Sequence, residues 1–340
     1  MFNRKSGKKF IFLLFIGLLI VAAISLTCGQ IKIPLHNTLS AIGYQLGLPF
    51  FDKNDFTQEQ MAVVWYIRMP RMVVGLLVGA ALGISGAVMQ GIFSNPLADP
   101  GIIGVSSGAA TGAVLSIALG WATESMFVMP AFAFCGSVCA VALTVFLAMR
   151  NGKIPVMTLL LAGVAVGMLL GAVTSGLLTF MNEQKLQQYL FWMVGGLDYR
   201  RWEHVYMAIG PVSIGIVIML ALSRHLNILV LGETEAKAVG MSVLPFRMGL
   251  LFVAATSVCV SGNIGFVGLV VPHMMRMIVG PDHRVLLPAS ALAGAAFLVI
   301  CDSLGRIIIP PAEVRVGIMT ALLGTPYFLY LLRRMQKQVF

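Results

Sequence analysis

The sequence predicts an all-α integral membrane protein with ten transmembrane helices, some of them short or broken. Of its 340 residues, 59% are hydrophobic and 11% are charged, whereas an ordinary soluble domain has about 25% charged residues. The mean hydropathy is +0.93, and the apolar residues form runs long enough to cross a bilayer. We therefore expect one transmembrane domain over residues 1–340, solvated by membrane lipid on most of its perimeter.

The predicted spans are bounded by charged or turn-rich breaks. A helix needs about 20 mostly apolar residues to cross the hydrocarbon core. Clear candidates lie at roughly 10–28, 70–90, 102–119, 127–149, 156–180, 204–222, 285–305 and 315–332. The stretch from about 247 to 280 is too long for one crossing, and SGNIG at 261–265 interrupts it. Basic residues at both chain ends favour the cytoplasm for both termini, which requires an even number of crossings. We therefore divide this stretch into two short helices, which brings the total to ten.

The ionisable and sulfur-containing residues exclude several classes of function. Carriers coupled to protons or sodium usually hold carboxylates near the bilayer centre, whereas Asp99 is expected in a loop and Asp302 near the outer end of a span. The five cysteines form no C-x-x-C pair and have no histidine at zinc spacing, so no metal site and no catalytic residues are predicted. The net charge of +10 clusters at span ends, which indicates orientation in the bilayer rather than nucleic-acid binding.

Any ATP that drives transport must be bound by another subunit. The chain contains no G-x-x-x-x-G-K-[ST] loop to hold nucleotide phosphates. Its longest hydrophilic stretch on the cytoplasmic side is 223–245, where helix-forming residues lie between Gly232 and Gly240. We expect one or two short helices there, lying across the inner face. The residues alone leave open whether this segment is an ordinary connection or a docking surface for a cytoplasmic partner.

Five motifs, in order along essentially the whole chain, resemble the FecCD-type permeases of ABC importers for iron-siderophores, haem and cobalamin. These motifs are RMPR at 68–71, GAALGISGAVMQ at 79–90, NPLADPGIIGVSSGA at 95–109, LGETEAKAVG at 231–240 and GNIGFVGLVVPHMMR at 262–276. The resemblance implies a multi-pass permease of the bacterial cytoplasmic (inner) membrane that forms a homodimer with a second copy of itself. Two cytoplasmic ATPase subunits, which bind ATP and Mg, and an extracytoplasmic substrate-binding protein complete the implied transporter. The resemblance further implies that this chain itself needs no cofactor and is no enzyme.

The resemblance also implies roles for particular residues. Those expected to couple the permease to the ATPase, within the segment 223–245, are Leu231, Gly232, Glu233, Glu235, Ala236 and Gly240. Those expected to face outward and dock the binding protein are Arg68, Arg71 and Arg306. Those expected along the translocation path are Met89, Gln90, Asn95, Pro96, Ser106 and Ser107.

One position departs from the family pattern, and two questions of function stay open. The family commonly has ELPVG before the last span, whereas this chain has Glu313-Val314-Arg315-Val316-Gly317. We expect Arg315 to pair with Glu313 rather than with an anionic substrate. Transport is expected by alternating access, with a ferric siderophore as the first-ranked substrate, haem second and cobalamin third. The alternative function is a passive channel or a secondary carrier of a small solute.

Overall fold

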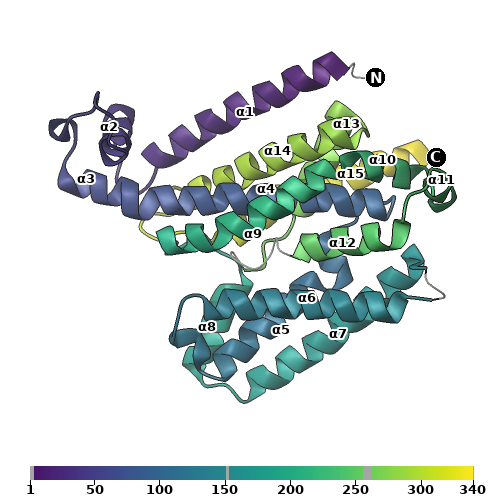
Figure 1. The fold of residues 1–340 in the computed structure, drawn as a ribbon. Coiled ribbons are helices and arrows are strands. Elements are labelled where there is room, and N and C mark those ends of the chain that lie inside the picture. Colours follow the sequence, from purple (N-terminus) through teal and green to yellow (C-terminus); the bar gives the residue numbers. More distant parts are fainter. Residues whose placement is uncertain (1–3, 151–152, 256–261, 340) are drawn as a thin grey trace.

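The computed structural model describes residues 4–150, 153–255 and 262–339, and the long regular elements in these ranges are helices (Figure 1). The helices of the first half are α1 (Arg4–Thr27), α2 (Leu35–Gln45), α3 (Gln58–Ala62), α4 (Met69–Ile92), α5 (Val105–Ala118), α6 (Val128–Ala148) and α7 (Val156–Thr179). Those of the second half are α8 (Glu183–Met193), α9 (Trp202–Ala221), α10 (Ser223–Leu231), α11 (Glu233–Ala238), α12 (Val243–Ala255), α13 (Val267–Val279), α14 (His283–Gly305) and α15 (Val316–Val339). A π-helical turn, η2 (Val63–Arg68), joins α3 to α4, and a 3-10 turn, η3 (Pro100–Ile103), precedes α5.

The predicted spans match apolar helices of the described chain. Six helices are long and apolar enough to cross a membrane, namely α1, α4 with its preceding turns, α6, α7, α9 and α14. Three shorter apolar helices, α5, α13 and most of α15, match further predicted spans. The tenth is α12, which precedes the interrupted region, although residues 256–261 of that region lie outside the described residues. The prediction of a ten-helix membrane protein with short helices is thus confirmed.

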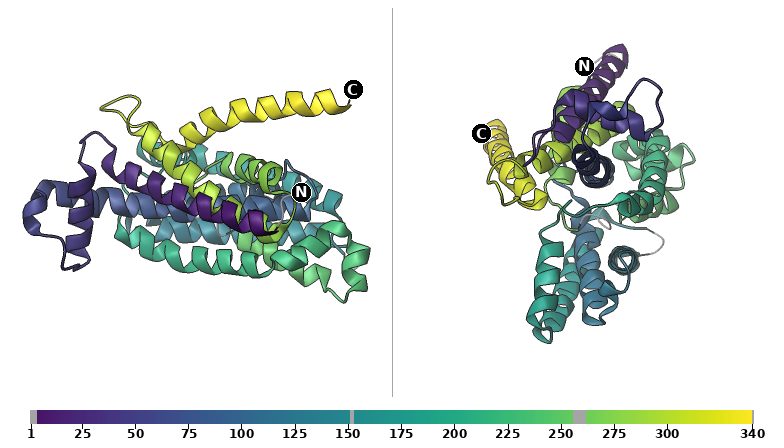
Figure 2. Two further views of the ribbon diagram at one scale, coloured as in Figure 1. Left: turned by 90° about the horizontal axis from the view of Figure 1, so that it is seen from above. Right: turned by 90° about the vertical axis from the view of Figure 1, so that its left-hand side faces the viewer.

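The helices run roughly parallel and form two groups. Helix α4 lies at the centre of one group, with α1, α9, α13 and α14 around it, whereas α5, α6 and α7 form the other (Figures 1 and 2). We call the end of the bundle that carries α2 and α3 the α3 end. The opposite end, which carries α10 and α11, is the α11 end, and both chain termini lie there (Figure 1). Both termini at one end is the arrangement that an even number of crossings requires.

Small residues let α4 and α14 approach until their backbones touch. A Cβ on Gly79 would meet the carbonyl of Gly294, and a Cβ on Gly83 would meet the carbonyl of Ser290. Only small residues allow such a distance between helix axes, and this kind of packing replaces the hydrophobic effect as the source of helix association in lipid. The glycines of the 79–90 motif therefore fix α4 against α14 as one rigid pair.

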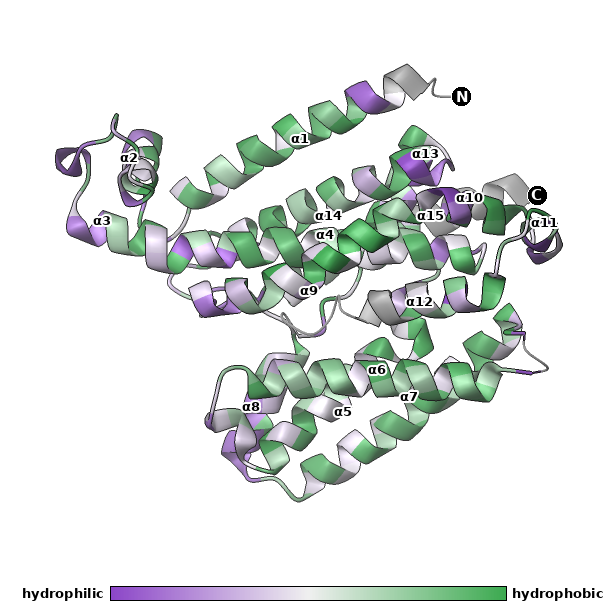
Figure 3. Cartoon of the chain, in the orientation of Figure 1, coloured by the Kyte–Doolittle hydropathy of each residue, from purple (hydrophilic) through white to green (hydrophobic). Residues whose placement is uncertain are grey.

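Apolar side chains cover the outside of the bundle as well as its interior. Most of α1 and α7 is exposed in the described chain although both helices are strongly apolar, and green hydrophobic ribbon extends along nearly the full length of the long helices (Figure 3). The hydrophilic segments gather at the two ends, in α2, α3 and α8 and in α10 and α11 (Figure 3). This distribution is what a chain solvated by lipid around its middle requires.

Candidate functional site

The expected coupling segment folds as two short helices at the α11 end, which confirms the secondary structure predicted for it. Helix α10 ends at Leu231, and Gly232 follows with φ +141°, a value that side chains rarely allow. Helix α11 starts at Glu233, and Gly240 ends the segment with φ +81°. The two glycines therefore set the sharp corners on either side of α11. Ala236 of α11 is fully buried, whereas Leu231, the last residue of α10, is 73% exposed.

Glu233 forms one ion pair within α11 and a second one with α12. The Glu233 carboxylate lies 2.8 Å from Nζ of Lys237 on the same helix and 3.7 Å from Nη1 of Arg247 on α12. The hydrogen bond from Lys237 lowers the pKa of Glu233, so this carboxylate stays ionised. Arg247 is buried and donates to the carbonyl of Ile154 at 2.7 Å. Lys153, Glu233 and Lys237 also line a shallow pocket of about 420 Å³ next to α11.

Asn227 fastens α10 to the start of α14. Its Nδ2 donates to Oδ1 of Asp282 at 2.6 Å, and its Oδ1 accepts the backbone N–H of His283 at 2.9 Å. Asp282 also accepts the N–H of Arg284 at 3.0 Å, as an N-cap of α14. Sequence reasoning missed this group, which we call the Asn227 latch (Asn227, Asp282 and His283). An aspartate directly before an apolar run is a signal for the cap but not for its partner on α10.

Arg71 is the centre of a buried ionic network at the α3 end. Its Nε and Nη2 donate to Asp302 at 2.8–3.1 Å, its Nη1 donates to Glu313 at 2.7 Å, and its Nη2 also donates to Asp198 at 3.1 Å. Arg306 pairs with Asp302 at 3.3 Å and Arg315 with Asp198 at 3.8 Å. Three arginines thus face three carboxylates, and we call these six residues the Arg71 network. It joins α4, α14 and the chain segments that precede α9 and α15.

The other two expected docking arginines bind the end of α1. Arg68 donates to the carbonyls of Leu26, Thr27 and Ile31, and Arg306 donates to the carbonyls of Ser25 and Cys28. The last carbonyls of a helix have no partner within it, and cations are favourable there. The side chains of Arg68, Arg71 and Arg306 are buried. The expectation that these arginines face outward is therefore wrong for the described chain, because internal acceptors use their donors; their role in docking stays a prediction.

Arg315 does not pair with Glu313, which corrects the prediction made for it. Glu313 binds Arg71 instead. The guanidinium of Arg315 lies over the ring of Phe191, 4.3 Å from its centre, and donates to the carbonyl of Phe191 at 2.6 Å. Asp198, whose carboxylate lies 3.8 Å from Nε of Arg315, supplies the carboxylate partner that Glu313 does not.

An open pocket of about 570 Å³ lies above the Arg71 network at the α3 end. Its lining includes Tyr66, Tyr199, Arg200, Arg201 and Arg315. Tyr199 is 91% exposed and has φ +56°, a conformation that is uncommon for a residue with a side chain. Burial lowers the pKa of Arg200 to about 10, so this arginine remains charged at neutral pH. The exposed arginine and tyrosine side chains at the α3 end therefore line this pocket, whereas the arginines of the RMPR motif are buried.

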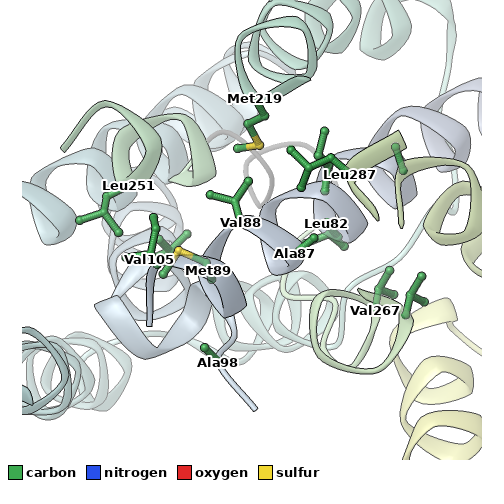
Figure 4. Close-up of a cluster of buried hydrophobic side chains, with 14 of the residues drawn as sticks. Leu82, Ala87, Val88, Met89, Ala98, Val105, Met219, Leu251, Val267 and Leu287 are labelled. Carbon is green, nitrogen blue, oxygen red and sulfur yellow. The ribbon is translucent and has the colours of Figure 1, made fainter. Parts of the chain in front are cut away.

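The expected path residues fall into two sets in the structure. Met89 and Gln90 are buried in the chain, and Met89 packs among apolar side chains that include Val105 and Leu251 (Figure 4). Gln90 donates to the carbonyl of Leu269 at 3.0 Å. Asn95 is exposed, and Pro96, Ser106 and Ser107 are partly exposed. Only the second set has surface available to a solute, and the role of all six in a path stays a prediction.

Asp99 lies deeper in the bundle than the sequence predicts. Its Oδ2 and the carbonyl of Leu82 both lie 3.2 Å from the point that a Cβ on Gly268 would occupy. Leu82 is near the middle of α4, so the segment that follows α4 turns back and carries Asp99 to mid-helix depth. Asp99 does lie in a loop, between α4 and η3, as the sequence predicts, but this loop reaches the depth of the middle of α4. The lack of carboxylates near the bilayer centre can therefore no longer be used to exclude a secondary carrier. The comparison with known families is needed to distinguish a carrier from an importer.

Comparisons with known proteins agree on one family. The model of the FecCD transport family matches residues 17–334. The cobalamin import system permease protein BtuC of Halobacterium salinarum is 45% identical over 315 residues, which are 92% of this chain and 82% of that protein. The hemin transport system permease protein HmuU of Yersinia pestis is 41% identical over 293 residues, which are 84% of this chain and 87% of that protein.

The fold agrees with these relatives. A solved structure, described as an inward-facing conformation of a metal-chelate type ABC transporter, superposes with a TM-score of 0.84 at 34% identity and covers 96% of this chain and 99% of that chain. The relatives are named as permease proteins, which are the membrane subunits of such transporters. The chain therefore belongs to the FecCD transport family, as a multi-pass permease subunit of an ABC importer in which separate subunits hydrolyse ATP.

Proposed function

We propose that this chain carries a metal-chelate nutrient into the cell through the cytoplasmic membrane by alternating access, driven by two ATPase subunits that dock on α10 and α11. The observation that supports the proposal is the construction of α11. It is a short helix with an exposed charged face, bounded by glycines at positive φ and tied by Glu233 to Arg247 of a spanning helix. A rigid helix of this kind can transmit a displacement that an unstructured loop would absorb.

This proposal assigns the two ends of the bundle and the partners. The α11 end, with both termini, is cytoplasmic, and the α3 end faces the binding protein that delivers the substrate. A second copy of the chain completes a homodimer around the path. Arg201, Tyr66 and Tyr199, which are exposed in the pocket above the Arg71 network, fit a delivery protein with acidic side chains, since Tyr and Arg are enriched in protein interfaces and opposite charges steer such encounters.

The names of the relatives bear on the substrate. One relative is named for cobalamin and another for hemin, and both compounds are metal-containing tetrapyrroles. We therefore propose a metal tetrapyrrole as the cargo, ahead of the ferric siderophore that the sequence alone ranks first.

The proposal is tested with this permease reconstituted in liposomes with its ATPase subunits and delivery protein. The wild-type complex should hydrolyse ATP and accumulate hemin or cyanocobalamin, whereas a ferric hydroxamate should accumulate poorly. The double variant Glu233→Arg, Gly240→Trp should remain folded but lose assembly with the ATPase. The matched control is Glu59→Arg on α3, an equally drastic charge change at the opposite end. Solute movement by the permease without any ATPase would refute the importer and favour the channel or carrier.

A further inference from the structure

Both polar groups of the Asn227 side chain are used within the latch, whereas Nε2 of His283 is buried without a hydrogen-bond partner. Asn227 Oδ1 accepts the backbone N–H of His283 and also lies 2.7 Å from its ring Nδ1. An amide oxygen can only accept, so Nδ1 of the imidazole must carry the proton. The amide Nδ2 meanwhile donates to Asp282. An amide side chain offers a donor and an acceptor side by side, as this position requires, and a carboxylate or an alkyl group of the same size does not.

Three helices meet tightly around the latch. A Cβ added to Gly91, in the last turn of α4, would lie 2.8 Å from Nε2 of His283 and 3.2 Å from the side chain of Leu226 on α10. His283 and Leu226 are each 1% exposed. At this density a shift of α10 cannot be absorbed by a void. The start of α14 must therefore follow α10 as long as the hydrogen bonds of the latch hold.

Helix α14 connects the latch to the Arg71 network. It has 23 residues, which span about 34 Å at 1.5 Å per residue. Its N-cap, Asp282, binds Asn227 at one end, and Asp302 binds Arg71 and Arg306 near the other. Between them, the backbone contacts with α4 keep the pair of helices from sliding apart. One rigid unit thus runs from the segment next to α11 to the ionic network at the opposite end.

We propose that Asn227 is a positioning residue for transport, which transmits the displacement of α10 and α11 to α14 and so to the Arg71 network. The proposal rests on the ATP-driven import proposed above, and it adds that coupling passes through the hydrogen bonds of one amide side chain. In this proposal Asn227 acts through Asp282 and His283 rather than through contact with ATP or cargo. Removing its amide should therefore separate ATP hydrolysis from uptake, while assembly and hydrolysis persist.

The test measures three quantities on the reconstituted importer with its ATPase and delivery protein: the amount of ATPase bound, the rate of ATP hydrolysis, and the hemin or cyanocobalamin accumulated per ATP. Asn227→Ala removes the latch, and Asn227→Asp places a carboxylate against Asp282. The double variant Asn227→Asp, Asp282→Asn exchanges donor and acceptor and can remake the hydrogen bonds. The matched control, Asn182→Ala, removes an asparagine N-cap of α8, where Asn182 accepts the N–H of Lys185 at 3.0 Å.

We expect Asn227→Ala to lower uptake per ATP by about fivefold to tenfold at unchanged assembly, the range expected for the loss of part-buried hydrogen bonds of ordinary strength. Asn227→Asp should lower it further, the exchanged pair should recover most of it, and Asn182→Ala should leave it unchanged. An unchanged ratio in Asn227→Ala would overturn the proposal. So would a loss of assembly that the exchanged pair fails to restore, because the latch would then serve folding alone. Failure of the wild type to couple uptake to ATP would instead count against the function proposed above.

Discussion

Removing the side chain of Arg71 is the most direct test of the ionic network at the α3 end. In Arg71→Met the methylene stem is kept, but Asp302, whose side chain is 4% exposed, loses its bidentate partner and keeps only Arg306 at 3.3 Å. Breaking a buried ion pair by removing one partner costs about 3–5 kcal/mol. The side chain of Glu313 is 32% exposed, and a pair that reaches solvent contributes only about 0–1 kcal/mol. We therefore expect a loss of about 4 kcal/mol in the free energy of unfolding.

A double-mutant cycle separates the buried pair from the rest of the network. The four proteins are the wild type, Arg71→Met, Asp302→Asn and the double variant, and their free energies of unfolding are measured by denaturant titration in mixed micelles. Removing both partners of a buried pair is generally less harmful than removing one, although here Arg306 also loses Asp302 whenever Asp302 is replaced. We expect the two changes to be non-additive by about 2 kcal/mol. A loss below about 1 kcal/mol in Arg71→Met, or strictly additive effects, would refute this account of the network.

Three further outcomes follow from the structure. Gly83→Ala should lower the free energy of unfolding by about 1–3 kcal/mol because the added methyl meets the backbone of α14. Gly171→Ala, where the added methyl has nothing within 4 Å, should raise it by up to about 1 kcal/mol through helix propensity. Thermal unfolding of the two variants should therefore show shifts of opposite sign. Burial raises the pKa of Asp282, but its hydrogen bonds outweigh burial and hold that pKa below its ordinary value. The stability that these hydrogen bonds give is present above the ordinary pKa of an aspartate, and it is lost as the pH falls through the lowered pKa of Asp282. The stability gap between wild type and Asp282→Asn should therefore shrink on acidification, and a gap that widens contradicts the assignment. Arg201→Glu, in the pocket above the network, should slow association of the delivery protein most at low salt, and Arg150→Glu, at the opposite end, should leave that rate unchanged.

The sequence was sufficient to predict the helices that cross the bilayer. Each predicted span lies within a few residues of an observed apolar helix, because the hydrocarbon thickness demands a long uninterrupted apolar run. The same rule missed the continuation of α4 back to Gln58, since residues 58–68 contain polar side chains and no bilayer requires them to be helical. It also missed α8, an amphipathic helix of 11 residues, which is too short to form a span.

The partners of the charged residues could not be predicted. Arg71 and Asp302 are separated by 231 positions, and nothing local to RMPR indicates which carboxylate its second arginine meets. Arg315 stands two residues from Glu313, yet it binds Phe191 and Asp198 from another part of the chain. Local spacing gives a correct partner only where a helix fixes it, as for Glu233 and Lys237 one turn apart.

The continuous helical stretch from Gln58 to Ile92 has mechanical consequences. Its 35 residues extend about 52 Å at 1.5 Å per residue, whereas the hydrocarbon core measures about 30 Å. Roughly 20 Å of this rod must stand clear of the lipid. Such a rod acts as a lever: a tilt of about 10° at one tip sweeps the other through about 9 Å. The π-helical turn at Val63–Arg68 lies where the rod leaves the bundle, so the projecting part, with α2 and α3 attached, can amplify small rotations of the buried part.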